Sequence, residues 1–326
     1  MTTPYYEDEH VTLYHGDSLE ILPTLDVEAS ALLTDPPYFK VKQDEWDNQW
    51  DKAGDFLSWM GEWLDMCKPL IAANGSVWVF ASPALTSSVE RVVAERFKVL
   101  NSIRWVKQAG WHQKAELGAM RRFTSPWEGI VFAEQYGADS TSRDGLWASV
   151  HEPIRQYLNE LRESAGMTVQ DINIAWQTMR GTKGQTPGHW YSKSQWLMPT
   201  PEHYEWMLDT LGVRGREYED LRREYEDLRR PFAIADRALS TDVWTYPTVS
   251  PYAGKHPCEK PVQMLEDMIR TSTRPGDLVL DPFAGSGSTL VAARNLGRRA
   301  VGIEKDERYC ATIAERLQVA TLDFAA

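Results

Sequence analysis

The run Asp35–Tyr38, Asp-Pro-Pro-Tyr, places a carboxylate, two prolines and an aromatic ring side by side. The prolines lack backbone N–H donors and restrict the chain, so the Asp35 carboxylate and the Pro36 carbonyl form a rigid array of acceptors. Such an array suits an aryl amine, because holding both of its N–H groups frees the nitrogen lone pair for attack. The Tyr38 ring would stack on the base that carries the amine. The predicted catalytic residues are Asp35, Pro36, Pro37 and Tyr38, and the plainer alternative is an Asp-Pro turn.

A second run, Asp281–Thr289, lies between an apolar strand pattern and a helical pattern. Its glycines let the backbone turn sharply and approach a ligand, and the helix N-terminus that follows offers free N–H groups. The next predicted strand ends in Glu304, an acid placed to bind ribose hydroxyls. A dinucleotide fingerprint is incomplete, because Leu290 stands where the third glycine would be, and no phosphate loop follows. The predicted cofactor residues in this part of the chain are Asp281, Pro282, Phe283, Gly285, Gly287, Ser288, Thr289 and Glu304.

Short apolar segments alternate with helical patterns along most of the chain, which predicts an α/β fold with a parallel sheet covered on both faces. The predicted strands are Val11–His15, Ala29–Thr34, Ser76–Ala81, Ser102–Val106, Gly129–Ala133, Asp277–Leu280 and Ala300–Glu304. The predicted helices are Phe56–Cys67, Ser87–Phe97, Val262–Thr271, Ser288–Leu296 and Asp306–Leu317. Each of the two chemical runs, Asp35–Tyr38 and Asp281–Thr289, directly follows one of these strands.

The alternation stops between residues 135 and 242. A predicted helix at Pro153–Ser164, a turn, and a second helix with Thr168 as its N-cap outline either a helix-turn-helix or an ordinary helical hairpin. The heptad REYEDLR then occurs twice in tandem over residues 216–229. Its tyrosines and leucines fall on one helix face, which indicates a solvated helix packed along one stripe or a short coiled coil.

The formal net charge of −12 by itself argues against a nucleic-acid partner. Basic residues nevertheless gather locally, and the stretch Arg180–Lys193 contains no acid. Such faces can hold phosphates, whereas base choice needs polar side chains at groove edges. The candidate DNA contacts are Arg121, Arg122, Lys183 and Lys193 for phosphates, and Gln170, Asn173 and Gln177 for bases; the alternative is a set of solvated surfaces.

Several classes of protein are disfavoured. The three cysteines and seven histidines show no metal-ligand spacing and no disulfide framework, so we expect catalysis without a protein-bound metal. No apolar run approaches the roughly 18 residues that span a bilayer. The acidic N-terminus lacks the features of a signal peptide, which predicts a cytoplasmic protein without membrane attachment.

Together, Asp-Pro-Pro-Tyr and Phe-x-Gly-x-Gly resemble motifs IV and I of the amino-methylating DNA methyltransferases. The catalytic motif precedes the cofactor motif, an order similar to the β class of that family. The segment VTLYHGDSLEIL resembles motif III, whose acid, here Asp17, would lie beside the cofactor adenine. His256–Pro261 resembles motif X, whose lysine, here Lys260, would flank the methionine carboxylate. Phe123–Phe132 resembles the segment that closes the catalytic half.

The resemblance implies a Rossmann-like sheet in circularly permuted motif order that binds S-adenosylmethionine. Its parts would be a catalytic half at 1–134, a helical target-recognition insertion at 135–242, and a cofactor-binding half at 243–326. The implied reaction is site-specific methylation of N6 of a flipped-out adenine in double-stranded DNA, by a homodimer with or without a cognate restriction enzyme. The alternatives are N4-cytosine methylation, a nicotinamide-dependent oxidoreductase, and a non-enzymatic DNA-binding protein.

Overall fold

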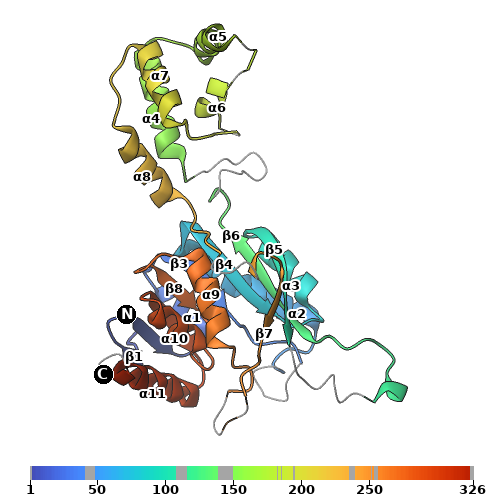
Figure 1. The fold of residues 1–326 in the computed structure, drawn as a ribbon. Coiled ribbons are helices and arrows are strands. Elements are labelled where there is room, and N and C mark those ends of the chain that lie inside the picture. The colour runs from blue at the N-terminus through green and yellow to red at the C-terminus, as the bar shows by residue number, and fades with distance from the viewer. Residues whose placement is uncertain are drawn as a thin grey trace. The chain divides into compact units, whose positions relative to one another are not determined.

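The structure is a computed structural model that describes residues 2–323 except 41–47, 108–115, 139–149, 182, 185, 194, 235–238, 251 and 253–255. The chain forms two compact units. The first contains residues 1–135 and 231–326 and carries the sheet, and the second contains residues 136–230 and is helical (Figure 1). Residues 231–242, which the sequence grouped with the helical region, therefore belong to the sheet-bearing unit.

The sheet has nine strands in the order β1-β2-β9-β8-β3-β4-β6-β5-β7. Five neighbours, β2, β9, β8, β3 and β4, run parallel. Strand β6 is antiparallel to both β4 and β5, so the prediction of a parallel sheet is wrong at this end. An antiparallel pair such as β5 and β6 needs no crossover helix, and the described part of their connection holds only the short 3-10 turn η5 (Leu117–Ala119). The strands are β1 (Tyr6–Glu7), β2 (Val11–His15), β3 (Ala29–Thr34), β4 (Ile71–Ala81), β5 (Lys98–Lys107), β6 (Trp127–Glu134), β7 (Val243–Tyr246), β8 (Leu278–Asp281) and β9 (Arg299–Glu304).

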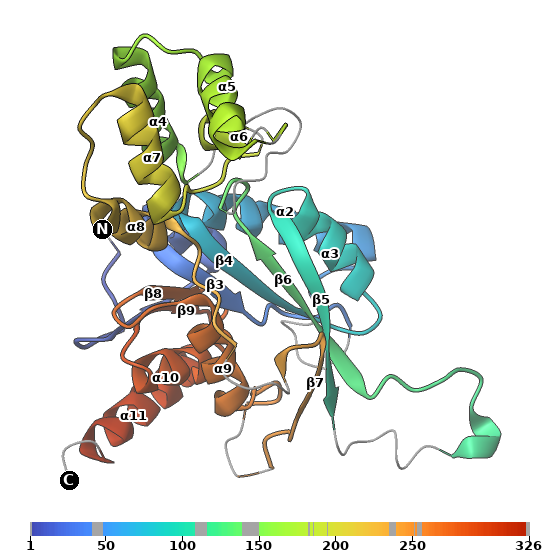
Figure 2. The same ribbon diagram turned by 45° about the horizontal axis from the view of Figure 1, so that its top comes forward.

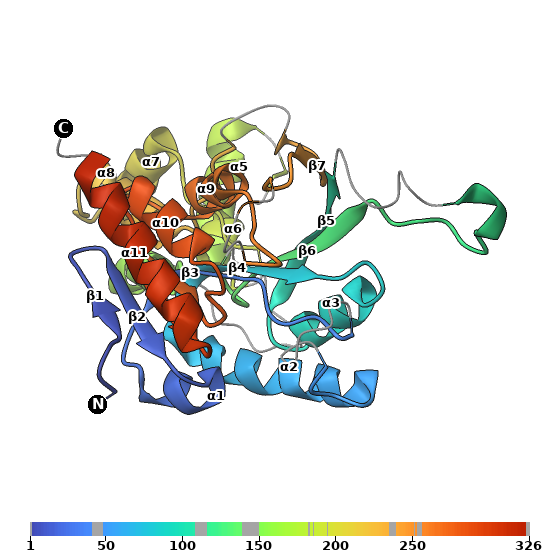
Figure 3. The same cartoon turned by 90° about the horizontal axis from the view of Figure 1, so that it is seen from below.

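Helices cover both faces of the sheet, as predicted (Figure 3). Neighbouring residues of β3 point to opposite faces: Leu33 joins a buried cluster with α9, α10 and α11, and Leu32 joins one with α2 and α3. Two apolar layers around one sheet make the rigid frame on which the strand ends are held. The helices of this unit are α1 (Ser18–Ile21), α2 (Ala53–Cys67), α3 (Thr86–Ala94), α9 (Val262–Ser272), α10 (Ser288–Asn295) and α11 (Glu307–Asp323).

The second unit packs its helices around a separate buried cluster (Figure 2). Thr168 caps α5 as predicted: its hydroxyl accepts from the Asp171 N–H, and the Asp171 carboxylate accepts from the Thr168 N–H, which completes a capping box. The tandem heptads form α8, which buries Leu221 and packs the rest of the predicted stripe on the same cluster. The helices are α4 (Glu152–Ser164), α5 (Val169–Arg180), α6 (Thr186–Tyr191), α7 (Pro201–Leu211) and α8 (Tyr218–Leu228).

Within the described ranges, no helix combines the length and the apolar character that crossing a bilayer requires.

Candidate active site

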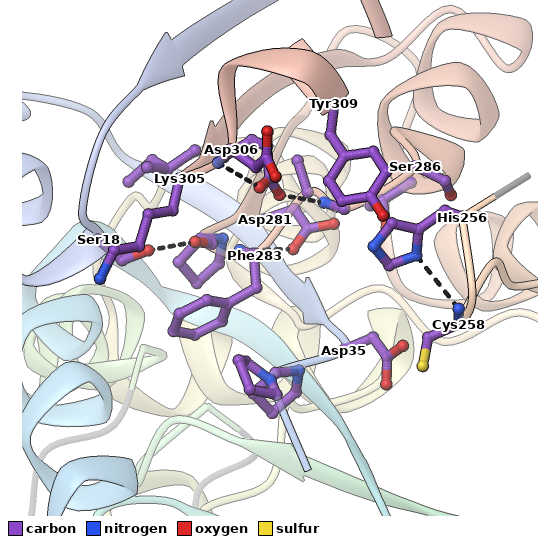
Figure 4. Close-up of a pocket in the computed structure, with 18 of the residues that line it drawn as sticks. Ser18, Asp35, His256, Cys258, Asp281, Phe283, Ser286, Lys305, Asp306 and Tyr309 are labelled. Atoms are coloured by element: carbon purple, nitrogen blue, oxygen red, sulfur yellow. Dashed lines mark hydrogen bonds between the residues drawn. The ribbon is translucent and has the colours of Figure 1, made fainter. Parts of the chain in front are cut away.

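A cavity of about 870 Å³ lies at the carboxyl ends of the neighbouring strands β3, β8 and β9 (Figure 4). This is the edge at which open α/β sheets bind ligands. Asp35 follows β3, Asp281 ends β8 and Glu304 ends β9, so both chemical runs meet there although they are far apart in the sequence. The predicted residues that line the cavity are Asp17, Asp35, Pro36, Pro37, Tyr38, Lys260, Asp281, Pro282, Phe283, Gly285, Ser288, Thr289 and Glu304.

The Asp281 carboxylate organises the glycine-rich loop. Its Oδ1 accepts from the Thr34 hydroxyl at 2.8 Å and from the Phe283 N–H at 3.1 Å. Burial raises the pKa of Asp281 to about 6, against the lowering effect of these hydrogen bonds. The Phe283 ring packs against the rings of Trp59 and Trp63 and forms one wall of the cavity.

Glu304 ties the end of β9 to the same loop. Its Oε2 accepts from the Gly285 N–H and its Oε1 from the Asp306 N–H, both at 2.8 Å. Each carboxylate oxygen can accept a second hydrogen bond, so both keep a position for a ligand hydroxyl. Burial raises the pKa of Glu304 to about 7.

Gly287 differs from the other predicted loop residues, because it is not among those that line the cavity. It is the N-cap of α10, with φ +76°, and a Cβ there would lie 2.8 Å from Cγ1 of Ile313. The turn and the packing against α11 therefore both require a glycine at position 287.

Asp17 caps α1 and lines the cavity beside a cation. Its Oδ1 accepts from the Leu19 N–H at 3.0 Å, and its Oδ2 accepts from Lys305 Nζ at 2.8 Å. Burial raises the pKa of Asp17, but Lys305 and the Leu19 amide outweigh it, so the net pKa is lowered and the group is ionised at neutral pH.

Lys260 pairs with the catalytic carboxylate. Its Nζ, on a side chain only 6% exposed, donates to Asp35 Oδ2 and, at 3.3 Å, to the Cys258 carbonyl. The sequence resemblance placed this lysine beside the methionine carboxylate, whereas in the structure its contact is Asp35. Among the described residues, no donor reaches the buried Asp35 Oδ1. Burial raises the pKa of Asp35, and Lys260 offsets this only in part.

Glu128 belongs to the same charged cluster, and sequence reasoning did not single it out. It accepts from Lys107 Nζ at 2.5 Å and from the Tyr38 hydroxyl at 3.3 Å, and it lies 3.4 Å from Lys260 Nζ. The available signal was its position as the only acid in the segment Phe123–Phe132. Sequence reasoning interpreted that segment as a whole and not residue by residue.

Other lining residues were also missed. His256 meets the Tyr309 ring edge-on at 4.4 Å, and its Nδ1 accepts from the Cys258 N–H (Figure 4). His256 lies in the run that resembles motif X, but no sequence pattern pointed to Tyr309, which α11 brings to the cavity. Among the described residues, no group of three His, Cys, Asp or Glu side chains could hold a metal ion.

The loop after the catalytic motif falls partly outside the described residues, and Trp46 lies in that part. Trp50 packs on the Phe56 and Trp59 rings, at 5.1 and 4.7 Å between centroids. Trp50 is therefore part of the buried core of the sheet-bearing unit.

Arg121 and Arg122 are exposed in the segment between β5 and β6, whose described part, residues 116–126, projects from the sheet (Figures 1 and 2). The next residue, Phe123, is 94% exposed. In the second unit, the side chains of Gln170, Lys183 and Lys193 are exposed.

The other two predicted base-reading residues make contacts within the second unit. Asn173 Oδ1 accepts from the Gly188 N–H at 3.2 Å, and Gln177 Nε2 donates to the Gly184 carbonyl at 3.3 Å. Asn173 therefore connects α5 to α6, and Gln177 connects α5 to the segment that leads into α6.

Comparison with known proteins was consistent across families, sequences and structures. Residues 29–315 match the family model described as DNA methylase. The type II methyltransferase M2.DpnII of Streptococcus pneumoniae is 27% identical, over 98% of this chain and 93% of that protein. The DNA adenine methyltransferase YhdJ of Escherichia coli (strain K12) is 24% identical, over 97% of this chain and 85% of that protein. The structure of the PvuII DNA methyltransferase (cytosine-N4-specific) matches with a TM-score of 0.56 at 15% identity. The match covers 97% of this chain and 89% of that chain, and it shows a likeness of fold.

Proposed function

This chain belongs to the DNA methylase family, and we propose that it transfers a methyl group from S-adenosylmethionine to N6 of adenine in double-stranded DNA. The relatives M2.DpnII and YhdJ, named as a type II methyltransferase and a DNA adenine methyltransferase, support this proposal over the full length of the chain. In the family that the sequence resembles, Asp-Pro-Pro-Tyr goes mostly with N6-adenine and Ser-Pro-Pro-Tyr with N4-cytosine, so Asp35 supports adenine over the N4-cytosine alternative.

The order of the two motifs along the chain and the role of the helical unit are also part of the proposal. The catalytic run follows β3 and the glycine loop follows β8, and these two strands are adjacent in the sheet although the first precedes the second along the chain. This arrangement supports the circularly permuted order of the β class. We assign the helical second unit, residues 136–230, to target recognition, because it interrupts the chain between the two halves of the sheet.

The residues present fit S-adenosylmethionine. A cavity of about 870 Å³ suits a ligand of nucleoside size. The Glu304 oxygens retain acceptor positions for ribose hydroxyls, and Asp281 offers a carboxylate to the methionine ammonium. When bound there, the cofactor supplies an electrophilic methyl group on its sulfonium. Phe283 and the Gly285 turn would hold it along the strand ends.

The buried Asp35 Oδ1 is the observation that carries the proposed mechanism, because it is an acceptor without a donor from the described residues, on a side chain that lines the cavity. Adenine must be flipped out of the duplex to reach it, which costs a few kcal/mol. Asp35 and the Pro36 carbonyl would accept the two N–H groups, and the Tyr38 ring would stack on the base. The protein orients the amine for direct in-line attack and excludes water, and N6 later loses a proton.

The proposed DNA contacts come from both units. Arg121 and Arg122 would hold phosphates, and the adjacent exposed Phe123 would pack against bases or sugars. In the second unit, Lys183 and Lys193 would hold phosphates, and Gln170, as the exposed amide of the predicted set, would read bases. The family resemblance extends the proposal to a homodimer, which sedimentation of the purified protein tests.

The catalytic assignment is tested with Asp35→Ala. We expect this variant to lose methyl transfer to adenine in unmethylated genomic DNA, measured by mass spectrometry of the digested nucleosides. Its calorimetric affinity for S-adenosylmethionine should stay near that of the unaltered protein, because the cofactor residues follow other strands. Near-normal turnover in Asp35→Ala would contradict the mechanism, and methylated cytosine in place of adenine would select the N4 alternative.

A further inference from the structure

The ammonium of Lys260 lies between two buried carboxylates. It donates to Asp35 Oδ2, and it lies 3.4 Å from Glu128 Oε2. Asp35 lines the cavity, whereas Glu128 is not among the residues that line it. The Asp35 carboxylate therefore faces the cavity, and the Glu128 carboxylate contacts Lys260 from outside the cavity lining.

In the proposed mechanism, Asp35 must accept one of the two N–H groups of the target amine. A cation held on the same carboxylate competes for its lone pairs and weakens it as an acceptor. Removing the cation altogether would leave a buried carboxylate without a counter-charge, which is strongly unfavourable. The cation is best kept nearby but moved off Asp35 while the amine is bound.

We propose that Glu128 is a positioning residue that draws Lys260 away from Asp35 when the target amine binds, so that the Asp35 carboxylate becomes a stronger acceptor for the amine. This inference rests on the proposed function and adds to it a residue that acts through Lys260 on Asp35.

The surroundings of Lys260 allow this movement. Its Nζ lies 4.9 Å from the centre of the Phe80 ring and 5.4 Å from that of Tyr38, so aromatic faces flank the ammonium and stabilise its charge. Glu128 is fixed on β6, and its Oε1 is held by Lys107 Nζ on β5, which leaves Oε2 facing Lys260. Between a carboxylate anchored to the sheet and a lysine on a four-carbon stem, the lysine is the partner that moves.

The charge balance of the cluster supports the same role. Asp35 and Glu128 face Lys260 and Lys107, so the shift of Lys260 moves no net charge into or out of the buried site. Burial raises the pKa of Glu128, but the two lysines outweigh it, so the net pKa is lowered and Glu128 is available as an anion. The titratable and charged groups around Asp35 and Lys260 are Tyr38, Lys107, Glu128, Cys258 and Asp281.

The test compares Glu128→Gln with Glu134→Gln. Glu134 is a matched control, because it lies on the same strand, is buried, and pairs with a lysine, Lys98, at 3.2 Å. Single-turnover methylation of unmethylated genomic DNA is measured from pH 5 to pH 9 with saturating S-adenosylmethionine. We expect Glu128→Gln to lower the maximal rate by roughly 10- to 100-fold, as loss of a supporting partner does in other sites. Glu128→Asp, which keeps the charge, should recover part of the rate.

The pH profile separates positioning from a merely structural role. Glu128 raises the pKa of Asp35 by charge repulsion, so its neutralisation should lower that pKa and move the acid limb of the rate profile to lower pH. For Glu128→Gln we therefore expect a lower maximal rate together with an acid limb that lies at lower pH than in the unaltered protein. Glu134→Gln should leave both the rate and the limb near those of the unaltered protein.

Three results would overturn the inference: a Glu128→Gln rate within about twofold of the unaltered protein, equal losses in both variants, or a loss of rate with an unmoved acid limb. The unaltered protein in the same assay tests the proposed function separately. If it methylates adenine and the two glutamine variants behave alike, only the role of Glu128 is wrong. If it transfers no methyl group to adenine, the proposed function and the inference built on it both fail.

Discussion

At the scale of single residues, the carboxylates of the cavity differ in what holds them. Asp17 has a cation, Lys305, and its pKa is lowered. Asp281 and Glu304 accept hydrogen bonds from hydroxyl and amide groups, and burial raises their pKa values to about 6 and about 7. The two groups assigned to the cofactor are therefore the ones whose protonation changes near neutral pH.

Cofactor affinity should consequently depend on pH. Hydroxyl and ammonium donors need ionised acceptors, and protonation removes acceptor positions, so the affinity for S-adenosylmethionine should fall as the pH decreases from 7 toward 6. Calorimetry from pH 5.5 to pH 8 measures this dependence, and binding should release protons to the buffer near pH 6.5. In Glu304→Gln the affinity should be weaker and its pH dependence smaller. A wild-type affinity that is constant over this range would contradict the assignment of both carboxylates.

At the scale of elements, the turn between β8 and α10 depends on one glycine for two reasons. Gly287 has a positive φ, and a Cβ there would collide with Ile313 of α11. Gly297, after α10, also has a positive φ of +66°, but a Cβ there meets nothing within 4 Å.

The pair Gly287→Ala and Gly297→Ala separates backbone strain from steric contact. Gly297→Ala should cost about 1 kcal/mol of unfolding free energy, the penalty for an alanine in the left-handed region. Gly287→Ala should cost about 1–3 kcal/mol more, because the side chain of Ile313 must move. Urea denaturation measures both values. Equal losses would mean that α11 accommodates the new methyl group without strain.

At the scale of the whole molecule, the chain divides the proposed work between two units. The sheet-bearing unit holds the cavity, and the helical unit has its own core and its own exposed cations. A net charge of −12 does not prevent DNA binding if cations are concentrated where phosphates lie.

Replacing both Lys183 and Lys193 with Ala should weaken binding to all DNA sequences alike. The slope of log affinity against log salt should fall by about 0.9 for each lost phosphate contact, and cofactor affinity should not change. Fluorescence anisotropy over a salt series provides the measurement. The matched control replaces Arg222 and Arg223 of α8, which removes the same charge from the same unit. Equal losses in the two variants would assign the effect to net charge and not to the predicted basic stretch.

The base-reading part of the proposal now rests on Gln170. Gln170→Ala should change which sites are methylated, as read by methylome sequencing, because its amide is exposed whereas those of Asn173 and Gln177 bond within the unit. An unchanged set of methylated sites would remove α5 as the reading helix.

Local sequence patterns were sufficient for the elements and for the two chemical runs. Alternation of apolar residues and turn residues located seven of the strands of the sheet, and Thr168 correctly predicted the start of α5. Asp-Pro-Pro-Tyr and the glycine loop were found from residue types alone, because each forms its local geometry within a few neighbours. Strands β1 and β7 were not predicted, and the two residues of β1 are too few to show a periodicity.

Contacts between distant residues were decided only by the tertiary structure. Strand direction is set by pairing, so the antiparallel β6 could not be distinguished from a parallel strand by its apolar pattern. Lys260 is 225 positions from Asp35, and only the tertiary structure brings it, just before α9, between that carboxylate and Glu128 of β6. The sequence by itself determined which groups could do chemistry, because side-chain chemistry and short-range conformation are local properties. The fold decided which of those groups act on one another, because buried charges are paired by the geometry of the whole sheet.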